Sequence, residues 1–305
     1  MAEAARWIDL LDPDEATLRR MVPHEVHPRT LDQLRAPGLH DDEPRARFES
    51  HGDHIVGIFV APHSVRRENR VYYQEVNLVI AHDAVVTVRK TPDGGLPFRS
   101  EPLEETLRVA GALPAGMLAY YIVDQIAEQY LDLVDELADE VDELEEGIET
   151  WEPELIRTRI GDLRRDILLA RRMLGPAREA VNHIVSRRID ITGGEIFPRD
   201  IELNFADAYD KLLRANDGLE LIRDLVVGAR DYHQSKIAHE QNEVMKRLTV
   251  IAALLLFPTF LVGVYGQNFV HMPELKWRLG YLFSWGVIAV VTLGQLWWFR
   301  RKKWL

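Results

Sequence analysis

Two long uncharged segments near the C-terminal end dominate the hydrophobic pattern of this chain. The first runs from Leu248 to Tyr265 and the second from Leu279 to Phe299. A helix needs about 20 largely apolar residues to cross a hydrocarbon core of roughly 30 Å. The pattern therefore predicts two transmembrane helices, at residues 248–265 and 279–299, joined by the short polar loop 266–278.

Basic residues flank this predicted hairpin unevenly. Lys246 and Arg247 precede the first segment and residues 300–303 after the second are all basic, whereas the loop holds only Lys276 and Arg278. The side of a membrane protein richer in Lys and Arg faces the cytoplasm. We therefore expect both termini in the cytoplasm, with 300–305 as a basic cytoplasmic tail and the loop 266–278 outside.

Helical periodicity extends upstream from the first segment to about residue 199. At about 1.5 Å per residue, such a helix would be roughly 100 Å long. That exceeds what a membrane needs, so residues 200–247 are expected to form a stalk in the cytoplasm and residues 248–265 to continue it as the first transmembrane helix.

One row of positions along this helix alternates in spacing between four and three residues, which is the seam of a left-handed helical supercoil. Most of its side chains are small or polar, whereas a self-associating coil favours branched apolar residues. The row suits the wall of a narrow aqueous path, but tight packing of membrane helices also gathers small residues. The pattern alone leaves both interpretations open. The seam comprises Asp231, Ser235, Ala238, Asn242, Met245, Thr249, Ala252, Leu256, Thr259 and Gly263.

The first part of the chain, residues 1–112, has the alternating pattern of a mixed α/β domain. Segments rich in Val, Ile, Tyr and Phe are separated by turn residues, as in short strands. Strands are expected at 54–60, 71–81 and 84–89, and short helices at 13–21, 27–34 and 102–110.

The helical spacing of apolar residues in 113–199 predicts a long antiparallel pair of helices. The first helix carries ten carboxylates and no Lys or Arg between Asp132 and Glu149, and the second helix is rich in arginine. Such a run of like charge repels itself unless a basic neighbour or cations screen it. We favour facing charges on the two helices over a cation-binding tip.

The absence of cysteine and the acidic net charge exclude several kinds of site and partner. The chain has 305 residues, no cysteine and a net charge of −12, so disulfides and thiolate metal sites are excluded. Residues 1–245 hold 48 of the 49 acidic residues and 29 of the 37 basic ones, which makes nucleic acid an unsuitable partner. An acidic cytoplasmic domain does attract cations.

Four sequence blocks resemble the CorA family of divalent-cation channels. They are Asn242–Thr249 (NEVMKRLT), Tyr265–Phe269 (YGQNF), Met272–Trp277 (MPELKW) and Lys302–Leu305 (KKWL), in the family's order and spacing. The family's signature is Gly-Met-Asn, and here the middle residue is Gln267. The resemblance implies an α/β N-terminal cytoplasmic domain, then long helices and a two-helix transmembrane hairpin, in a CorA-like funnel formed by a homopentamer in a bacterial plasma (inner) membrane.

The resemblance also implies roles for individual residues. Asn268 corresponds to the external selectivity ring and Gly266 to the glycine beside it, while Gln267 either adds an amide ligand or faces the loop. Asn242 corresponds to a second polar ring and Asp231 to the acidic ring at the cytoplasmic mouth, and Thr259 and Gly263 belong to the same pore-facing seam. The hydrophobic gate corresponds to Met245, Leu248 and Leu256.

Asp207 falls where the family has an acidic residue that binds regulatory Mg²⁺ at a subunit interface. Its expected acidic partner after the strand ending near Val60 is missing, since the sequence there is Ala61-Pro62-His63. The regulatory site is therefore either retained at Asp207 in altered form or absent. The resemblance implies Mg²⁺ as the transported ion and, if the site is retained, as a regulatory ion at Asp207, with no other cofactor.

The expected function is influx of divalent cations, with Mg²⁺ favoured and Co²⁺ or Ni²⁺ as further cargo, driven by the membrane potential and gated by cytoplasmic Mg²⁺. The expected partners are further copies of the chain, the lipid bilayer and divalent cations. A Zn²⁺ transporter like the ZntB branch, with or without proton coupling, is the first alternative. A non-conducting membrane scaffold or sensor is the second. No enzyme motif is recognised, because His24-Glu25-Val26-His27 lacks the spacing of a zinc-protease helix.

Overall fold

The computed structural model describes residues 4–22, 26–35, 46–65, 70–91, 98, 100–189, 195–267, 272 and 277–304. The chain divides into two units, Met1–Ala229 and Arg230–Leu305. The finer domain boundaries expected from the sequence stay predictions.

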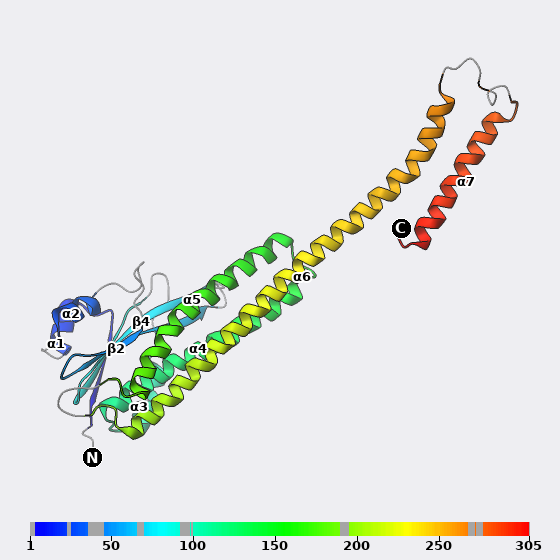
Figure 1. The fold of residues 1–305 in the computed structure, drawn as a ribbon. Helices are drawn as coiled ribbons and strands as arrows, with labels where there is room; N and C mark the ends of the chain where they lie inside the picture. The colour runs from blue at the N-terminus through cyan, green and yellow to red at the C-terminus, as the bar shows by residue number, and fades with distance from the viewer. Residues whose placement is uncertain are drawn as a thin grey trace. The chain divides into compact units, whose positions relative to one another are not determined.

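The first unit is built on a five-stranded sheet with the order β1-β5-β4-β3-β2. Figure 1 shows the strands of this sheet drawn as arrows. Its β1 and β5 are parallel, and the other neighbouring strands are antiparallel. The three predicted strands are present, and β3 and β4 pair along their full lengths. The sequence pattern did not single out β1 or β2, which are short and mostly only partly buried. The strands are β1 (Arg6–Leu11), β2 (Arg47–Ser50), β3 (Ile55–Val65), β4 (Arg70–Ile80) and β5 (Ala84–Arg89).

Helices cover both faces of this sheet, because its central strands are apolar on both sides. On one face, α1 (Glu15–Met21) and α2 (Pro28–Arg35) form a small core in which Leu18 and Leu34 join Val79, Val86 and Val88. On the other face, α4 (Ala115–Gly147) packs Ile122 and Ile126 into the larger core that holds Leu78 and Ile80. The alternation along β4 therefore separates the two cores.

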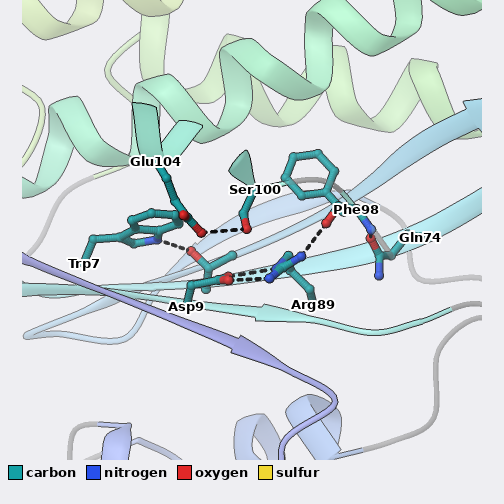
Figure 2. Close-up of polar contacts among 8 residues, drawn as sticks. Trp7, Asp9, Gln74, Arg89, Phe98, Ser100 and Glu104 are labelled. Carbon is teal, nitrogen blue, oxygen red and sulfur yellow. Dashed lines mark hydrogen bonds and ion pairs between the residues drawn. The ribbon is translucent and has the colours of Figure 1, made fainter. Parts of the chain in front are cut away.

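Polar contacts tie β1 to β5 near the start of α3 (Glu101–Ala110), beside the larger core (Figure 2). The Arg89 guanidinium donates to the carboxylate of Asp9 on the neighbouring strand, at 2.9 Å from Nε to Oδ1, and to the main-chain carbonyl of Phe98. The Trp7 indole donates to Thr87 at 2.8 Å. These partners satisfy polar groups that would be costly to bury alone.

Two long helices and the start of a third pack together in the first unit. The helices α4 and α5 (Pro153–Val185) bury regularly spaced apolar residues against α6 (Arg199–Tyr265). The Tyr130 hydroxyl on α4 donates to the carbonyl of Val60 on β3 at 2.9 Å. A Cβ at Gly218 on α6 would lie 2.6 Å from Val134 on α4, so this glycine allows a close helix approach.

An ion pair between the first two long helices agrees with the facing charges predicted for them. Arg159 on α5 lies 3.4 Å from Glu140 on α4. Arg157 and Arg165 instead pair with acidic residues one turn away on α5 itself. Apolar packing, with ionic contacts added at its edge, therefore holds this helical pair together.

The second unit contains the rest of α6 and α7 (Gly280–Arg301). The helix α6 is continuous over 67 residues and contains Pro258. Its length agrees with the helix predicted from residue 199 to Tyr265. The helix α7 covers most of the predicted second transmembrane segment and ends in Arg300 and Arg301.

Candidate ion-conducting site

The C-terminal parts of α6 and α7 are each long and apolar enough to cross a membrane, and little of either stretch is buried within the chain. Leu255, Phe260 and Val290 are more than half exposed. A soluble monomer does not leave such extended apolar surfaces in contact with water. These surfaces therefore require lipid or another polypeptide around them.

Aromatic rings gather at both ends of α7. Tyr281 and Trp285 are in contact near its start, and Trp298 contacts Phe299 and Trp304 near its end. From Tyr281 to Trp298 the helix rises roughly 26 Å at about 1.5 Å per residue. Aromatic residues at such a separation mark the two interfaces of a bilayer.

The seam residues of α6 share one property in the structure. All ten are exposed in the single chain, from Asp231 to Gly263. Exposure is not confined to the seam, since Ile251, Leu255 and Phe260 outside it are also more than half exposed. The helix therefore presents its polar and small residues on a surface that no other described part of the same chain covers.

The two seam threonines direct their hydroxyl hydrogens into their own helix. Thr249 Oγ1 donates to the carbonyl of Met245 at 2.8 Å, and Thr259 Oγ1 donates to that of Leu255 at 2.7 Å. A hydroxyl that donates its hydrogen to the backbone retains acceptor lone pairs on its oxygen. The oxygen of either threonine can therefore bind a cation directly or accept a hydrogen bond from a water molecule of its hydration shell.

The apolar gate residues and the acidic residue of the predicted ion path are also exposed in the single chain. Met245, Leu248 and Leu256 are 63%, 56% and 71% exposed. Asp231 lies 3.1 Å from Arg230 in an exposed ion pair. Asn242 is exposed one turn before Met245, so an amide precedes the apolar positions along the helix.

The signature residues lie at the end of α6. The Gly266 amide donates to Val262 at 2.8 Å and the Gln267 amide to Val264 at 3.3 Å, so the last helical turn is closed by the backbone. Gln267 is exposed. Asn268 lies outside the described residues, and its role as a selectivity residue stays a prediction.

The seam glycine Gly263 lies in open space within the single chain. A Cβ added there would meet nothing within 4 Å. Among the described residues, no close contact therefore requires a glycine at this position, and the missing side chain leaves room on the seam for an approach from outside the chain.

Asp207 belongs to a cluster of charged side chains on α4 and α6. On α6 it lies 3.4 Å from the ammonium of Lys211, which also donates to Asp124 on α4 at 2.7 Å and lies 2.6 Å from Glu128 on α4. We call these four residues the Lys211 cluster. Lys211 and Asp124 are largely buried, whereas Glu128 and Asp207 are 50% and 57% exposed.

Burial and charge act in opposite directions on these groups. Burial alone would lower the pKa of Lys211, but its hydrogen bonds to Asp124 and Glu128 outweigh that effect and raise the pKa above its ordinary value. Burial raises the pKa of Asp124, and Lys211 opposes the rise. Lys211 therefore stays charged at neutral pH.

Asp207 was predicted from the sequence, but the other three members of the cluster were not. Asp124 with Glu128, and Asp207 with Lys211, are each four residues apart and so share a helix face. That spacing was a usable signal, but only the packing of α6 on α4 brings the two pairs together. Among the described residues, no group of three or more His, Asp or Glu side chains is arranged to hold a metal ion.

The chain matches known proteins over nearly its whole length. The model of the family described as CorA-like Mg²⁺ transporter protein matches residues 2–301. The Bacillus subtilis (strain 168) protein YfjQ is 30% identical, with 98% of this chain and 89% of that protein covered. The cobalt/magnesium transport protein CorA of Thermotoga maritima is 29% identical, with 92% of this chain and 77% of that protein covered.

Several solved structures share the fold. The CorA magnesium transporter of Methanocaldococcus jannaschii superposes with a TM-score of 0.80 at 23% identity, covering 98% of this chain and 91% of that one. The cytoplasmic domain of ZntB from Vibrio parahaemolyticus gives a TM-score of 0.54 at 15% identity, covering 78% of this chain and 88% of that one.

Proposed function

We propose that this chain, which belongs to the CorA-like Mg²⁺ transporter family, conducts Mg²⁺ across a bacterial plasma membrane through a pore lined by the seam of α6. One observation carries the proposal. All ten seam residues are exposed in the single chain, and most of them are small or polar although the row continues into a stretch long and apolar enough to cross a membrane. A polar row left open along a membrane-spanning helix is suited to face water and ions.

A pore of this kind requires several copies of the chain. The transmembrane helices of one chain form a single hairpin, which cannot enclose an aqueous path. Cyclic symmetry would place the same seam from every copy around one axis. We propose a homopentamer, as the family resemblance implies, with both termini in the cytoplasm. The basic residues after α7 support that orientation.

The side chains of the seam favour a hard cation. Mg²⁺ prefers oxygen ligands and gives up its water reluctantly. The amide of Asn242 and the hydroxyl oxygens of Thr249 and Thr259 can accept hydrogen bonds from its hydration shell. The names of the cobalt/magnesium relative and of the magnesium transporter with the same fold support this ion. Co²⁺ and Ni²⁺ are the expected secondary cargo.

Conduction needs no chemical energy source. A divalent ion entering a negative interior gains about 4.6 kcal/mol per 100 mV, because each elementary charge contributes about 2.3 kcal/mol. Met245, Leu248 and Leu256 would interrupt flow in the closed state by excluding water from a narrow section. Control of that gate by cytoplasmic Mg²⁺ remains a proposal from the family resemblance.

Uptake into liposomes containing the purified protein tests the function. Mg²⁺ and Zn²⁺ uptake would be compared at a fixed membrane potential, with and without a pH gradient. Potential-driven Mg²⁺ entry without a pH gradient is the expected result. An Asn242→Leu variant, with the oligomer verified by size-exclusion chromatography, would serve as a matched low-flux control.

Two other outcomes would contradict the proposal and favour a different function. Zn²⁺ entry that depends on the pH gradient would favour the ZntB-like alternative, for which the shared cytoplasmic fold of the Vibrio protein is the specific observation. No flux of either ion from correctly assembled protein would favour a non-conducting scaffold or sensor.

A further inference from the structure

The ammonium of Lys211 lies where three carboxylates from two helices converge. Its three hydrogens can serve three acceptors, and three carboxylate oxygens lie near it. They belong to Asp124 at 2.7 Å, Glu128 at 2.6 Å and Asp207 at 3.4 Å. The charge of Lys211 thus holds together acidic groups that would otherwise repel one another.

The cluster has an inner and an outer side. The side chains of Lys211 and Asp124 are only 13% and 19% exposed, whereas those of Glu128 and Asp207 are half exposed or more. Solvent cations can therefore reach the outer carboxylates. The inner position, where all three carboxylates converge, is filled by a cation that is covalently part of the chain.

A tethered ammonium is a strong competitor for that position. An intramolecular group acts at an effective concentration that reaches the millimolar range for short flexible tethers. Lys211 is four residues from Asp207 on the same helix, so its side chain reaches the cluster without any rearrangement. A divalent ion from solution would have to displace it and would then leave a buried, unpaired ammonium nearby.

We propose that Lys211 is a built-in cation that replaces a divalent metal ion at Asp124, Glu128 and Asp207, and that it thereby makes this part of the cytoplasmic unit independent of Mg²⁺. With Lys211 in place the three carboxylates are not arranged to hold a metal ion. Removal of the ammonium would leave them without a counter-charge and free to close around a divalent cation from solution. The ligands would be carboxylate oxygens, which suit Mg²⁺ and Ca²⁺.

One consequence rests on the proposed function. The family resemblance assigns Asp207 to a Mg²⁺ site that controls closure. With Lys211 bound to Asp207, closure of the wild-type channel should not depend on Mg²⁺ binding at this cluster. The Lys211→Met variant should gain such a dependence.

The direct test measures Mg²⁺ binding and needs no transport. Full-length oligomer in detergent would be titrated with Mg²⁺ while its melting temperature and its resistance to limited proteolysis are followed. Wild type, Lys211→Met and Lys211→Met/Asp124→Asn would be compared. We expect Lys211→Met to bind Mg²⁺ at least about tenfold more tightly than wild type, because a buried cation adjacent to the site has been removed, and we expect the double variant to lose the gain.

Arg171→Met provides a matched control. Arg171 on α5 forms an ion pair with Glu220 on α6 at 2.7 Å, so this variant removes one helix-to-helix ion pair outside the Lys211 cluster. It should not gain Mg²⁺ binding. If Lys211→Met does not assemble, Lys211→Gln, which is also uncharged but retains a hydrogen-bonding group, replaces it in the same titration.

Two results would overturn the proposal. One is equal Mg²⁺ dependence in wild type and in the Lys211 variants, and the other is a gain that survives Asp124→Asn. Liposome flux at varied internal Mg²⁺ would then test the effect on closure. Absence of flux in every variant would contradict the proposed function, while the binding titration would still decide the role of Lys211.

Discussion

The hydroxyl of Thr259 donates to the main-chain carbonyl of Leu255 one turn earlier, at 2.7 Å. This bond fixes the direction of the only polar hydrogen on the side chain and leaves the oxygen's lone pairs available. Thr259 is exposed on the seam. A residue usually explained by helix packing in membranes is therefore also positioned to accept hydrogen bonds from a hydrated cation.

Replacement of Thr259 by Val should reduce Mg²⁺ flux and leave assembly intact. The two side chains have nearly the same shape, and only the oxygen is lost. We expect a decrease of about 3- to 10-fold, which corresponds to roughly 0.6–1.4 kcal/mol of barrier. Thr259→Ser retains the oxygen and should conduct like wild type. Equal flux through all three proteins would exclude an oxygen contact at this position.

Asn268→Ala should abolish Mg²⁺ flux while the oligomer remains assembled. The prediction rests on the Gly-x-Asn match, in which Asn268 supplies the amide oxygen that meets the hydrated ion at the external mouth. Liposome uptake and size-exclusion chromatography measure the two properties separately. Gln267→Met, which recreates the family's usual middle residue, should keep the flux. Retained flux in Asn268→Ala would remove this residue from the filter.

Gly116→Ala should destabilise the first unit. A Cβ at Gly116 would overlap the main-chain oxygen of Ile196 and lie 3.0 Å from Ile201. Overpacking of this kind typically costs about 1–3 kcal/mol, so the melting temperature should fall by several degrees.

Gly161→Ala is the matched control for this prediction. Gly161 lies inside α5, and a Cβ there would meet nothing within 4 Å. Alanine in an open helical position should stabilise the protein by roughly 0.5–1 kcal/mol. An equal gain of stability in both variants would show that helix propensity, rather than the contact with Ile196, governs position 116.

Asp166 should make the first unit less stable as the pH rises. Burial, followed by the charges of Glu140 and Asp162, raises the pKa of Asp166 from 3.8 to about 6, and Arg165 and Arg159 oppose that rise. The folded state therefore binds the proton more tightly than the unfolded state does. The stabilising contribution is complete below about pH 4 and is lost as the pH passes through about 6.

Asp166→Asn should remove this dependence. One pKa unit corresponds to 1.36 kcal/mol, but Asp166 is only partly buried, so screening by solvent reduces the effect to about 1 kcal/mol. The variant should be more stable than wild type at pH 8, and the difference should vanish near pH 4. Melting curves of both proteins between pH 4 and 8 measure this. Parallel curves over the whole range would contradict the assignment.

The sequence by itself determined the membrane hairpin and the seam of α6. Both depend on local periodicity, since a long uncharged run and a four-and-three spacing need no knowledge of distant contacts. The sequence also located the three central strands, whose apolar runs are long. It did not locate β1 or β2, because a short, partly exposed strand is defined chiefly by its neighbours in the sheet.

Only the tertiary structure decided what surrounds Asp207. In the sequence, Asp124 and Lys211 are 87 residues apart, and nothing in their local patterns connects them. The close packing of α6 on α4, which Gly218 permits, brings the ammonium to the carboxylates. An ion pair between helices depends on which helices meet and at what rotation, and these are set by apolar side chains throughout the core rather than by the charged residues themselves.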